Sequence, residues 1–139
     1  MGAAQRCLEL SGDYARERVQ FGRPIGSFQA IKHKLANMLT EVEQARSASY
    51  FASREAAGAV AGGAVAGGDD LPLAASLAKA YTSDAFFHAA ADTIQIHGGI
   101  GFTWEHPAHL YFKRASSSSF LLGDADHHRR LFADQVLPA

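Results

Sequence analysis

Two long stretches with the apolar period of an α-helix constrain this chain more than any other feature of its sequence. One runs from Phe28 to about Ala57 and the other from Leu73 to His97, and in both the apolar side chains recur every three or four residues. The apolar positions of the first are Phe28, Ile31, Leu35, Leu39, Val42 and Ala45, and those of the second are Leu77, Tyr81, Phe87, Ala91 and Ile94. Because an amphipathic helix gains most of its stability from packing, each stretch needs a partner for its apolar face. The sequence therefore predicts two long helices inside a helical bundle.

The segment between these helices, Gly58 to Asp70, holds five glycines with alanine and valine between them. Such a composition is typical of a flexible loop, and here it predicts the connection between two antiparallel helices. Asp70 is expected to cap the following helix, and Pro72 is tolerated in its first turn.

Three further helices are predicted around the long pair. The first runs from Gly2 to Arg18, and its apolar face is formed by Ala3, Cys7, Leu10 and Tyr14. Another is expected to start with Thr103 as its cap and to bend or fray at Ser116–Ser119, and a short last helix follows Asp124. The predicted fold class is all-α: an antiparallel up-and-down four-helix bundle with a short fifth C-terminal helix, in one helical-bundle domain of residues 1–139.

Composition and charge exclude several classes of protein. With a formal net charge of -1, the chain has no general electrostatic attraction for nucleic acid or for an anionic membrane. It has no apolar run long enough to span a membrane, and it does not start like a signal peptide. Its single cysteine, Cys7, is predicted to be a small buried side chain. We therefore expect a soluble, cytoplasmic protein with no nucleic-acid or membrane partner.

The spacing of some histidines and acidic residues would place them on common helix faces. His106 and His109 form one such set, and Asp84, His88 and Asp92 form another. Neither set has the paired Glu-x-x-His pattern of di-iron bundles. Ser116–Ser119 and Cys7 have no identifiable base and orienter for nucleophilic catalysis. The residues by themselves therefore predict no metal site and no nucleophilic catalysis.

The connector between the first two predicted helices, residues 16–29, holds the densest polar chemistry of the chain. Gly22 can adopt a positive φ, Pro24 cannot continue a helix and Ser27 can cap the next one, so the segment is predicted to be a helix-turn-helix joint. It gathers the Arg18 guanidinium, amides and an aromatic ring at neighbouring helix ends, which suits an anionic ligand that carries a ring. A capped connector with solvated arginines explains the same residues.

Two blocks of this sequence resemble a known family. The first is Tyr14-Ala-Arg-Glu-Arg-Val-Gln-Phe-Gly-Arg-Pro-Ile followed by Phe28-Gln-Ala-Ile-Lys-His-Lys-Leu-Ala, and the second is Gln95-Ile-His-Gly-Gly-Ile-Gly-Phe-Thr-Trp-Glu-His-Pro-Ala-His-Leu-Tyr-Phe-Lys-Arg-Ala. In order and spacing they are similar to the two flavin-contacting signatures in the C-terminal helical domain of acyl-CoA dehydrogenases. The resemblance runs from about Gly2 to Arg130, and it weakens after Ala115.

The resemblance implies a part in the FAD-dependent α,β-dehydrogenation of an acyl-CoA thioester, with electrons passed on to an electron-transfer acceptor. It also implies that the chain contacts an FAD held mainly by an adjacent subunit of a homo- or hetero-tetramer. The implied cofactor-binding residues are Arg18, Gln20, Phe21, Gln29, Gln95, His97, Gly98 and Gly99, with Arg18 meeting the pyrophosphate. Two domains precede this one in the family, so we expect a piece of a longer enzyme that is inactive alone.

The family's usual catalytic glutamate is missing from its position. Alignment on Lys113-Arg114-Ala115 puts Leu122 there, and leucine cannot take a proton. Asp124 lies two residues later, but its shorter side chain and its expected N-cap role make it a poor substitute. The base is therefore expected from a glutamate upstream of Met1 or from a different subunit. Two other functions stay open: a non-catalytic assembly and cofactor-clamping subunit of a heteromeric dehydrogenase, and a flavin-free helical interaction protein.

Overall fold

The fold is built from helices, as the sequence predicts. The computed structural model describes residues 1–61 and 70–137 of the chain. Its elements are α1 (Gly2–Glu17), β1 (Val19–Gln20), β2 (Arg23–Pro24), the 3-10 turn η1 (Ile25–Ser27), α2 (Gln29–Ala61), α3 (Leu71–His97), the 3-10 turn η2 (Gly98–Phe102), α4 (Ala108–Ser119) and α5 (Ala125–Val136). The all-α prediction is therefore confirmed, with one pair of two-residue strands added.

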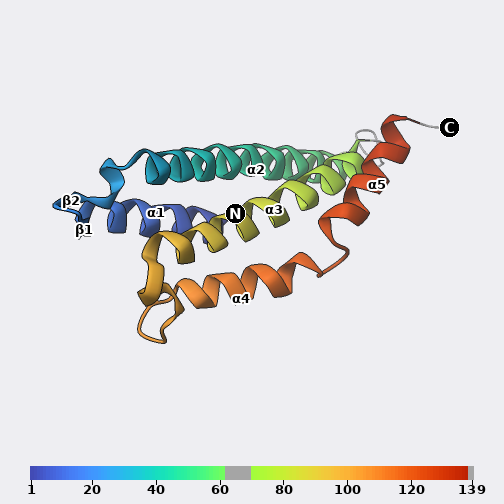
Figure 1. The fold of residues 1–139 in the computed structure, drawn as a ribbon. Helices are drawn as coiled ribbons and strands as arrows, with labels where there is room; N and C mark the ends of the chain where they lie inside the picture. The colour runs from blue at the N-terminus through green and yellow to red at the C-terminus, as the bar shows by residue number, and fades with distance from the viewer. Residues whose placement is uncertain (62–69, 138–139) are drawn as a thin grey trace.

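The central element of the fold is α3. It contacts α1, α2, α4 and α5, and its most extensive contact is with α2. In Figure 1, α1 to α4 run alternately toward and away from the end that carries β1 and β2, which is the predicted up-and-down order. The short helix α5 leaves α4 through a turn and packs against α3. This arrangement brings the connector between α1 and α2 and the C-terminal end of α3 to the same end of the molecule.

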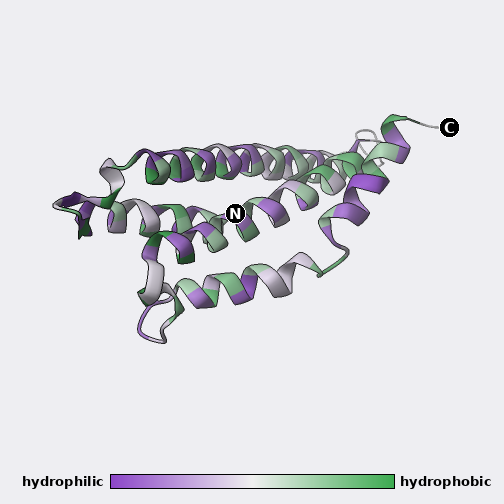
Figure 2. Ribbon diagram, in the orientation of Figure 1, coloured by the Kyte–Doolittle hydropathy of each residue, from purple (hydrophilic) through white to green (hydrophobic). Residues whose placement is uncertain are grey.

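Small side chains fill much of the core. The buried cluster consists of Ala4, Cys7, Met38, Val42, Ala89, Ala90, Ile96 and Ala115. Because alanine and cysteine project little from the backbone, the helices can approach closely. Many larger apolar side chains stay at the surface, and Figure 2 shows green apolar residues alternating with purple polar ones along the helices. None of the helices within residues 1–61 and 70–137 combines the length and the hydrophobicity that a membrane crossing needs.

The face that α1 buries lies one residue away from the predicted one. Its buried residues are Ala4, Cys7, Ser11 and Ala15. Leu10 and Tyr14, expected on the buried face, are only partly buried. The small residues let α1 lie close to α3, where the Ser11 hydroxyl donates to Oγ1 of Thr93 over 3.0 Å. The burial expected for Cys7 is confirmed, and this burial raises the pKa of its thiol to about 11.

The start of α2 differs from the predicted cap. Ser27 ends η1, and the extended residue before the helix is Phe28. The Phe28 carbonyl accepts the amides of Ile31 and Lys32, both over 3.1 Å. The predicted Ser27 cap is therefore wrong, because the chain needs one more extended residue to enter the helix.

The far end of α2 and the start of α3 depart from the predicted loop. Helix α2 continues through Gly58 to Ala61, so the predicted loop start is wrong, and residues 62–69 of that loop lie outside the described residues. The alanine-rich sequence around Gly58 tolerates one glycine, whose helix cost is about 1 kcal/mol relative to alanine. Asp70 stands at the N-cap of α3 without a side-chain capping hydrogen bond, and a proline lies in the first turn as predicted.

The fourth helix differs from its prediction at both ends. It starts at Ala108 rather than directly after Thr103, whose hydroxyl instead donates to the Ile100 carbonyl over 2.9 Å. The predicted bend or fraying at Ser116–Ser119 is wrong, because all four serines belong to the helix. Several of their hydroxyls donate to carbonyls three or four residues earlier, which keeps these side chains compatible with helical backbone.

Candidate functional site

The connector between α1 and α2 contains a β-hairpin that sequence reasoning missed. Its strands Val19–Gln20 and Arg23–Pro24 pair antiparallel. The loop residues Phe21 and Gly22 have φ values of 55° and 77°, and two positive φ values are typical of a type I′ turn. The positive φ of Gly22 agrees with the prediction, whereas strands of two residues are too short to give a periodic signal.

Backbone contacts hold this hairpin against the end of α1. The amide of Ile25 donates to the Arg18 carbonyl over 2.8 Å. At Gly26 an added Cβ would lie 2.8 Å from the Ala15 carbonyl oxygen, so this close approach requires glycine. The hairpin therefore has a fixed position relative to α1.

The hairpin and the start of α2 present a cation and an aromatic ring to solvent. The predicted cofactor-binding residues of this block are all exposed: Arg18, Gln20, Phe21 and Gln29. The Phe21 side chain is 90% exposed. Among the described residues the Arg18 guanidinium takes part in no ion pair, whereas the Arg23 guanidinium lies 4.1 Å from the centre of the Phe28 ring. Arg18 is thus a cation that an anionic ligand could reach here, and as far as the structure describes the chain its guanidinium makes no ring contact of the kind that holds Arg23.

The second block ends α3 in a glycine turn. Gly98 closes the helix with φ 63° and ψ -138°, a conformation that is open to glycine and strained for other residues. The predicted glycine stop is confirmed, although this ψ lies outside the left-handed helical region. An added Cβ at Gly98 or Gly99 would meet no atom within 4 Å, so the backbone of the turn is accessible to a ligand. Gln95, within the last turn of the helix, is exposed.

His97 is the predicted site residue that faces the interior. It is 5% exposed, and its Nδ1 donates to the Thr93 carbonyl over 2.7 Å. Its ring stacks on Tyr14 of α1 with 4.3 Å between centroids, and the ring centroid of His106 lies 4.2 Å away. Burial, together with the charges of His97 and His109, lowers the pKa of His106. Because Tyr14 begins the first block, its stacking on His97 joins the two blocks.

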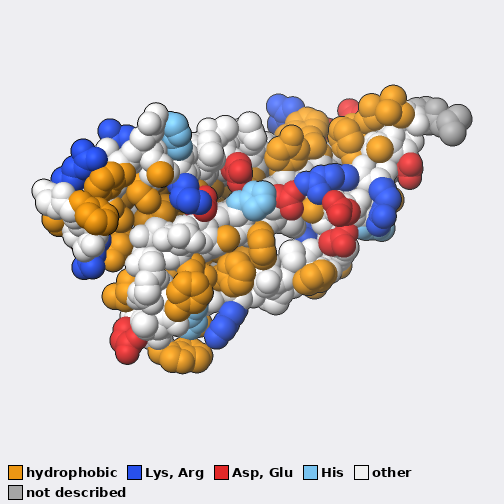
Figure 3. Space-filling model, viewed as in Figure 1, with side chains coloured by type: hydrophobic (Ala, Val, Ile, Leu, Met, Phe, Trp, Pro, Cys, Tyr) orange, Lys and Arg blue, Asp and Glu red, His pale blue; other side chains and the backbone are white. Residues whose placement is uncertain are grey.

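A cavity of about 480 Å³ opens beside Gln95, between α3, η2 and α4. Phe102 and Trp104 line it and are 75% and 80% exposed, and the Lys113 ammonium lies 4.5 Å from the Trp104 ring centre. Figure 3 shows apolar side chains in orange over this corner and over the hairpin end of the molecule, with basic side chains beside them. Sequence reasoning gave Phe102, Trp104 and Lys113 no role of their own. Aromatic residues directly after a glycine turn are the signal that could have found them.

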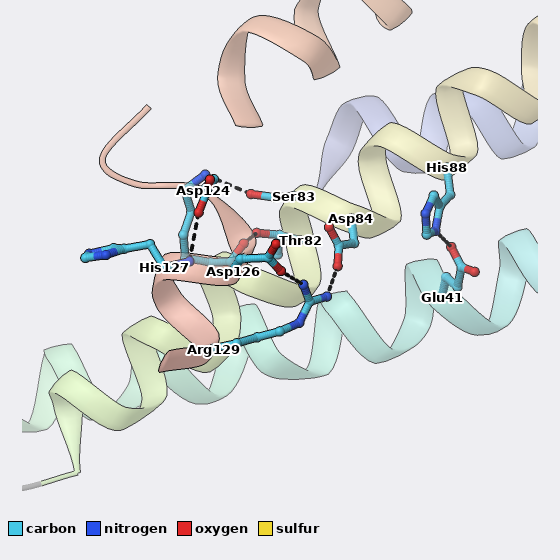
Figure 4. Close-up of polar contacts among 10 residues, drawn as sticks. Glu41, Thr82, Ser83, Asp84, His88, Asp124, Asp126, His127 and Arg129 are labelled. Carbon is cyan, nitrogen blue, oxygen red and sulfur yellow. Dashed lines mark hydrogen bonds and ion pairs between the residues drawn. The ribbon is translucent and has the colours of Figure 1, made fainter. Parts of the chain in front are cut away.

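Another cavity, of about 540 Å³, lies between α2, α3 and α5 and shares no lining residue with either block. Its charged groups pair with one another: His88 Nδ1 lies 3.1 Å from a Glu41 oxygen, and Arg129 pairs with Asp84 (Figure 4). These pairs leave little free charge for a ligand. Within the described part of the chain, histidines, cysteines and acidic residues form no group of three or more that could hold a metal ion.

The turn between α4 and α5 carries the position of the missing glutamate. Leu122 is 85% exposed and has a φ of 62°. Asp124 is the N-cap of α5, and its Oδ1 accepts the His127 amide over 2.7 Å (Figure 4). This hydrogen bond confirms the expected cap, and it engages the carboxylate that the sequence offers as a substitute for the base.

Comparison with known proteins agrees with this arrangement. Residues 1–137 match the family model described as acyl-CoA dehydrogenase, C-terminal domain. The chain belongs to this family. The resemblance of the two sequence blocks to acyl-CoA dehydrogenases is therefore confirmed over nearly the whole chain.

Similar proteins include both curated relatives and solved structures. Acyl-CoA dehydrogenase IpdE2 of Mycobacterium tuberculosis is 48% identical over 122 residues, which cover 88% of this chain and 34% of the relative. A chain of the ChsE4-ChsE5 complex of Mycobacterium tuberculosis has a TM-score of 0.87 and 30% identity, covering 99% of this chain and 35% of that one. An FAD-dependent dehydrogenase has the same TM-score of 0.87 and 30% identity, covering 98% of this chain and 34% of that one. This acyl-CoA dehydrogenase domain thus spans about a third of the length of the proteins it matches.

Proposed function

We propose that this chain is the C-terminal domain of an FAD-dependent acyl-CoA dehydrogenase, and that it contributes flavin contacts and part of the oligomer core. The observation that carries the proposal is the stacking of Tyr14 on His97, which joins the two family blocks at one end of the bundle. The two blocks are far apart in the sequence, and the packing of α1 against α3 places them side by side (Figure 1). Their junction supports one continuous ligand-contacting surface.

The residues at this end suit FAD. Arg18 offers a guanidinium for the pyrophosphate, Phe21 offers an exposed ring, and the open backbone at Gly98 and Gly99 permits close approach. The proposed contact residues are Arg18, Gln20, Phe21, Gln29, Gln95, Gly98 and Gly99, all directed at an FAD held mainly by an adjacent subunit. When bound, FAD supplies the redox chemistry that removes hydrogen from the acyl-CoA, and an electron-transfer acceptor takes the electrons.

His97 has a supporting role in this proposal. Its ring lies against Tyr14 and His106, and its hydrogen bond to the Thr93 carbonyl fixes the last turn of α3. A buried ring has little surface left for a ligand. We therefore assign His97 to holding the glycine turn in place, next to the flavin rather than stacked on it.

The exposed apolar side chains support an oligomer. Large examples that remain exposed are Leu39, Tyr50, Val60, Tyr81, Leu110 and Phe120. Side chains of this kind on a domain whose core is built from small residues suit contacts with other subunits. A homo- or hetero-tetramer of the full-length protein would cover them.

The catalytic base of the proposed enzyme lies outside these residues. Leu122 cannot take a proton, and the Asp124 carboxylate is engaged as a helix cap. The lack of a base at Leu122 and Asp124 also favours a second candidate function. This candidate is a non-catalytic subunit that clamps the cofactor in a heteromeric acyl-CoA dehydrogenase. The structural similarity to a chain of the ChsE4-ChsE5 complex supports that candidate further.

FAD binding by the full-length protein tests the proposal, with Arg18→Ala compared with Arg23→Ala. Both variants remove one positive charge from the connector between α1 and α2, but the Arg23 guanidinium already packs on Phe28. A hydrogen bond to a charged group contributes roughly 1.5 to 3 kcal/mol, so Arg18→Ala should weaken FAD binding about 10-fold to 100-fold, and Arg23→Ala should change it little. Equal losses in the two titrations would refute the role of Arg18.

The full-length wild-type protein also distinguishes the proposed enzyme from the two alternative functions. A wild-type full-length protein that binds no FAD would favour the flavin-free interaction protein. If FAD binds, flavin reduction by acyl-CoA in this protein alone would favour an enzyme with its base upstream of Met1. Reduction that requires a second kind of subunit would favour the heteromeric role.

A further inference from the structure

A column of three rings fastens the loop between η2 and α4, residues 103–107, to the helices behind it. The His106 ring lies against that of His97, with 4.2 Å between the centroids, and His97 stacks in turn on Tyr14 with 4.3 Å between the centroids. The three rings come from the loop, from α3 and from α1. His97 is 5% exposed, so the middle ring of the column is shielded from water.

The same His106 ring caps the start of α4. Pro107 stands at the N-cap of this helix and supplies no side-chain hydrogen bond to it. Instead, His106 Nδ1 accepts the Ala108 amide over 3.2 Å. The amides of Leu110 and Tyr111 both reach the Pro107 carbonyl. Ala108 is 0% exposed, so water cannot easily replace the imidazole as the partner of its amide.

A proton on His106 Nδ1 is incompatible with this arrangement. Nδ1 can accept the Ala108 amide only while it carries no hydrogen of its own, so protonation would set one donor against another. The added positive charge would lie at the N-terminal end of α4, where the helix dipole disfavours cations. It would also lie on the face of the buried His97 ring. The geometry therefore couples the protonation of His106 to the position of the loop.

The side chains around the His106 ring also favour its neutral form. Burial, together with the charges of His97 and His109, lowers the pKa of His106. Both neighbours are histidines, so neither offers a negative charge to a protonated ring. The adjacent carboxylate, Glu105, is exposed to water, which screens its charge. From α1, Tyr14 contributes a ring on the far face of His97 rather than a carboxylate.

We propose that His106 is an acid-sensitive latch: its neutral ring caps α4 and holds the loop on His97, and its protonation releases the loop and the first turn of α4. The loop carries Trp104, and Trp104 and His109 line the cavity of about 480 Å³ beside Gln95. Opening of the latch would therefore remove one wall of this cavity. The latch requires no flavin, so it goes beyond the proposed function and does not depend on it.

Proton linkage gives the direction of the pH effect. In the open loop His106 should titrate near the ordinary histidine pKa of about 6.5, whereas in the latched loop its pKa is lower. The latch is therefore at full strength well above about pH 6.5 and weakens as the pH falls below that value. Between the two pKa values, each unit of pH raises the equilibrium constant for opening by up to about tenfold.

Hydrogen exchange of the full-length protein, measured by mass spectrometry between about pH 8 and about pH 5, tests the latch. Labelling times are scaled at each pH so that intrinsic exchange is matched. The peptide of residues 103–112 contains the Ala108 amide, and the peptide of residues 37–46 contains buried Met38 and Val42 of α2 and reports unfolding of the whole domain. Protection of the first peptide should fall by up to about tenfold per pH unit below about pH 6.5, and the second should stay more protected at every pH.

Three variants assign the proton. His106→Asn supplies an acceptor that does not titrate, so its 103–112 peptide should show no loss of protection on acidification. His109→Gln removes a neighbouring charge and keeps the cap, so the loss of protection should begin at a higher pH than in the wild type. His33→Asn is the matched control, because His33 is an exposed histidine on α2, and it should keep the wild-type profile.

Several results would overturn the latch. One is protection of the 103–112 peptide that does not change over this pH range. Another is equal protection of the two peptides at every pH, since Ala108 would then be exposed only when the whole domain unfolds. Wild-type pH dependence in His106→Asn would assign the proton to a different histidine. A wild type without FAD would refute the proposed function but not the latch, because the exchange measurement needs no flavin.

Discussion

Removing the Thr93 hydroxyl should loosen the contact between α1 and α3 behind the proposed flavin-facing end. Thr93 and Ser11 are both 0% exposed, and the Ser11 hydroxyl donates to Thr93 Oγ1 over 3.0 Å. The single hydroxyl hydrogen of Thr93 can go to the Ala89 carbonyl at 2.7 Å or to the Cys7 carbonyl at 3.2 Å. Thr93→Val preserves the side-chain shape but leaves the Ser11 hydroxyl without its acceptor.

The expected loss of stability follows from the Ser11 hydroxyl, which no longer has an acceptor. A buried polar group that loses its partner costs roughly 1 to 3 kcal/mol, so Thr93→Val should lower the free energy of unfolding by that amount. At about 4 °C per kcal/mol for a domain of this size, the melting temperature should fall by roughly 4 to 12 °C. The double variant Ser11→Ala/Thr93→Val removes both partners and should be more stable than Thr93→Val alone.

Urea denaturation of the 139-residue chain, followed by circular dichroism at one protein concentration, measures these differences. Thr82→Val is the control, because the Thr82 hydroxyl bonds only to carbonyls of its own helix, the nearer one at 2.7 Å. The control should unfold close to the wild type. If the double variant were no more stable than Thr93→Val, the cost would not come from the orphaned Ser11 hydroxyl, and the reasoning would fail.

Three further perturbations test other parts of the domain. Gly26→Ala would put a Cβ 2.8 Å from a backbone carbonyl of α1. It should therefore displace the hairpin and weaken FAD binding by the full-length protein at least as much as Arg18→Ala, which removes the proposed pyrophosphate contact. Gly12→Ala, whose Cβ meets no atom within 4 Å, should leave that titration unchanged. Burial and nearby histidine charges lower the pKa of His106, and its Nδ1 accepts the Ala108 amide over 3.2 Å. The unfolded chain therefore takes up this proton more readily, and the melting temperature should fall as the pH drops below about 6.5. His106→Asn keeps an acceptor without titrating, so a variant with the full wild-type pH dependence would contradict this assignment. Asp124→Asn keeps a helix cap, so the full-length complex should retain activity within about tenfold, whereas loss of a general base costs roughly 100-fold to 10,000-fold. A loss of that larger size, with FAD content unchanged, would identify Asp124 as the base.

The sequence by itself determined the features that depend on neighbours along the chain. Helical periodicity located α2 and α3, because an amphipathic helix repeats its apolar residues at a fixed spacing. Gly98 marked the end of α3, because its own backbone conformation favours glycine. Asp124 marked the start of α5, because its side chain accepts an amide only three residues further along the chain. The two sequence blocks also indicated the family, because each is a short stretch that can be recognised without knowledge of the tertiary structure.

Tertiary structure decided which residues those helices bury. In α2 the predicted stripe included Leu39, yet Leu39 is 50% exposed, and Met38 is buried beside Val42. In α1 the buried face passes through Ser11 rather than Leu10. The spacing of apolar residues predicts the buried face of a helix only to within about one residue. The shape of the neighbouring helix decides which residues on that face are buried.

The meeting of the two blocks was also a tertiary result. Nothing local to Tyr14 or His97 predicts that their rings stack, because the contact depends on how α1 and α3 lie together. The hairpin likewise depends on Gly26 fitting against the end of α1. The sequence supplied the residues that we propose as flavin contacts, and packing between distant helices decided that they share one end of the domain.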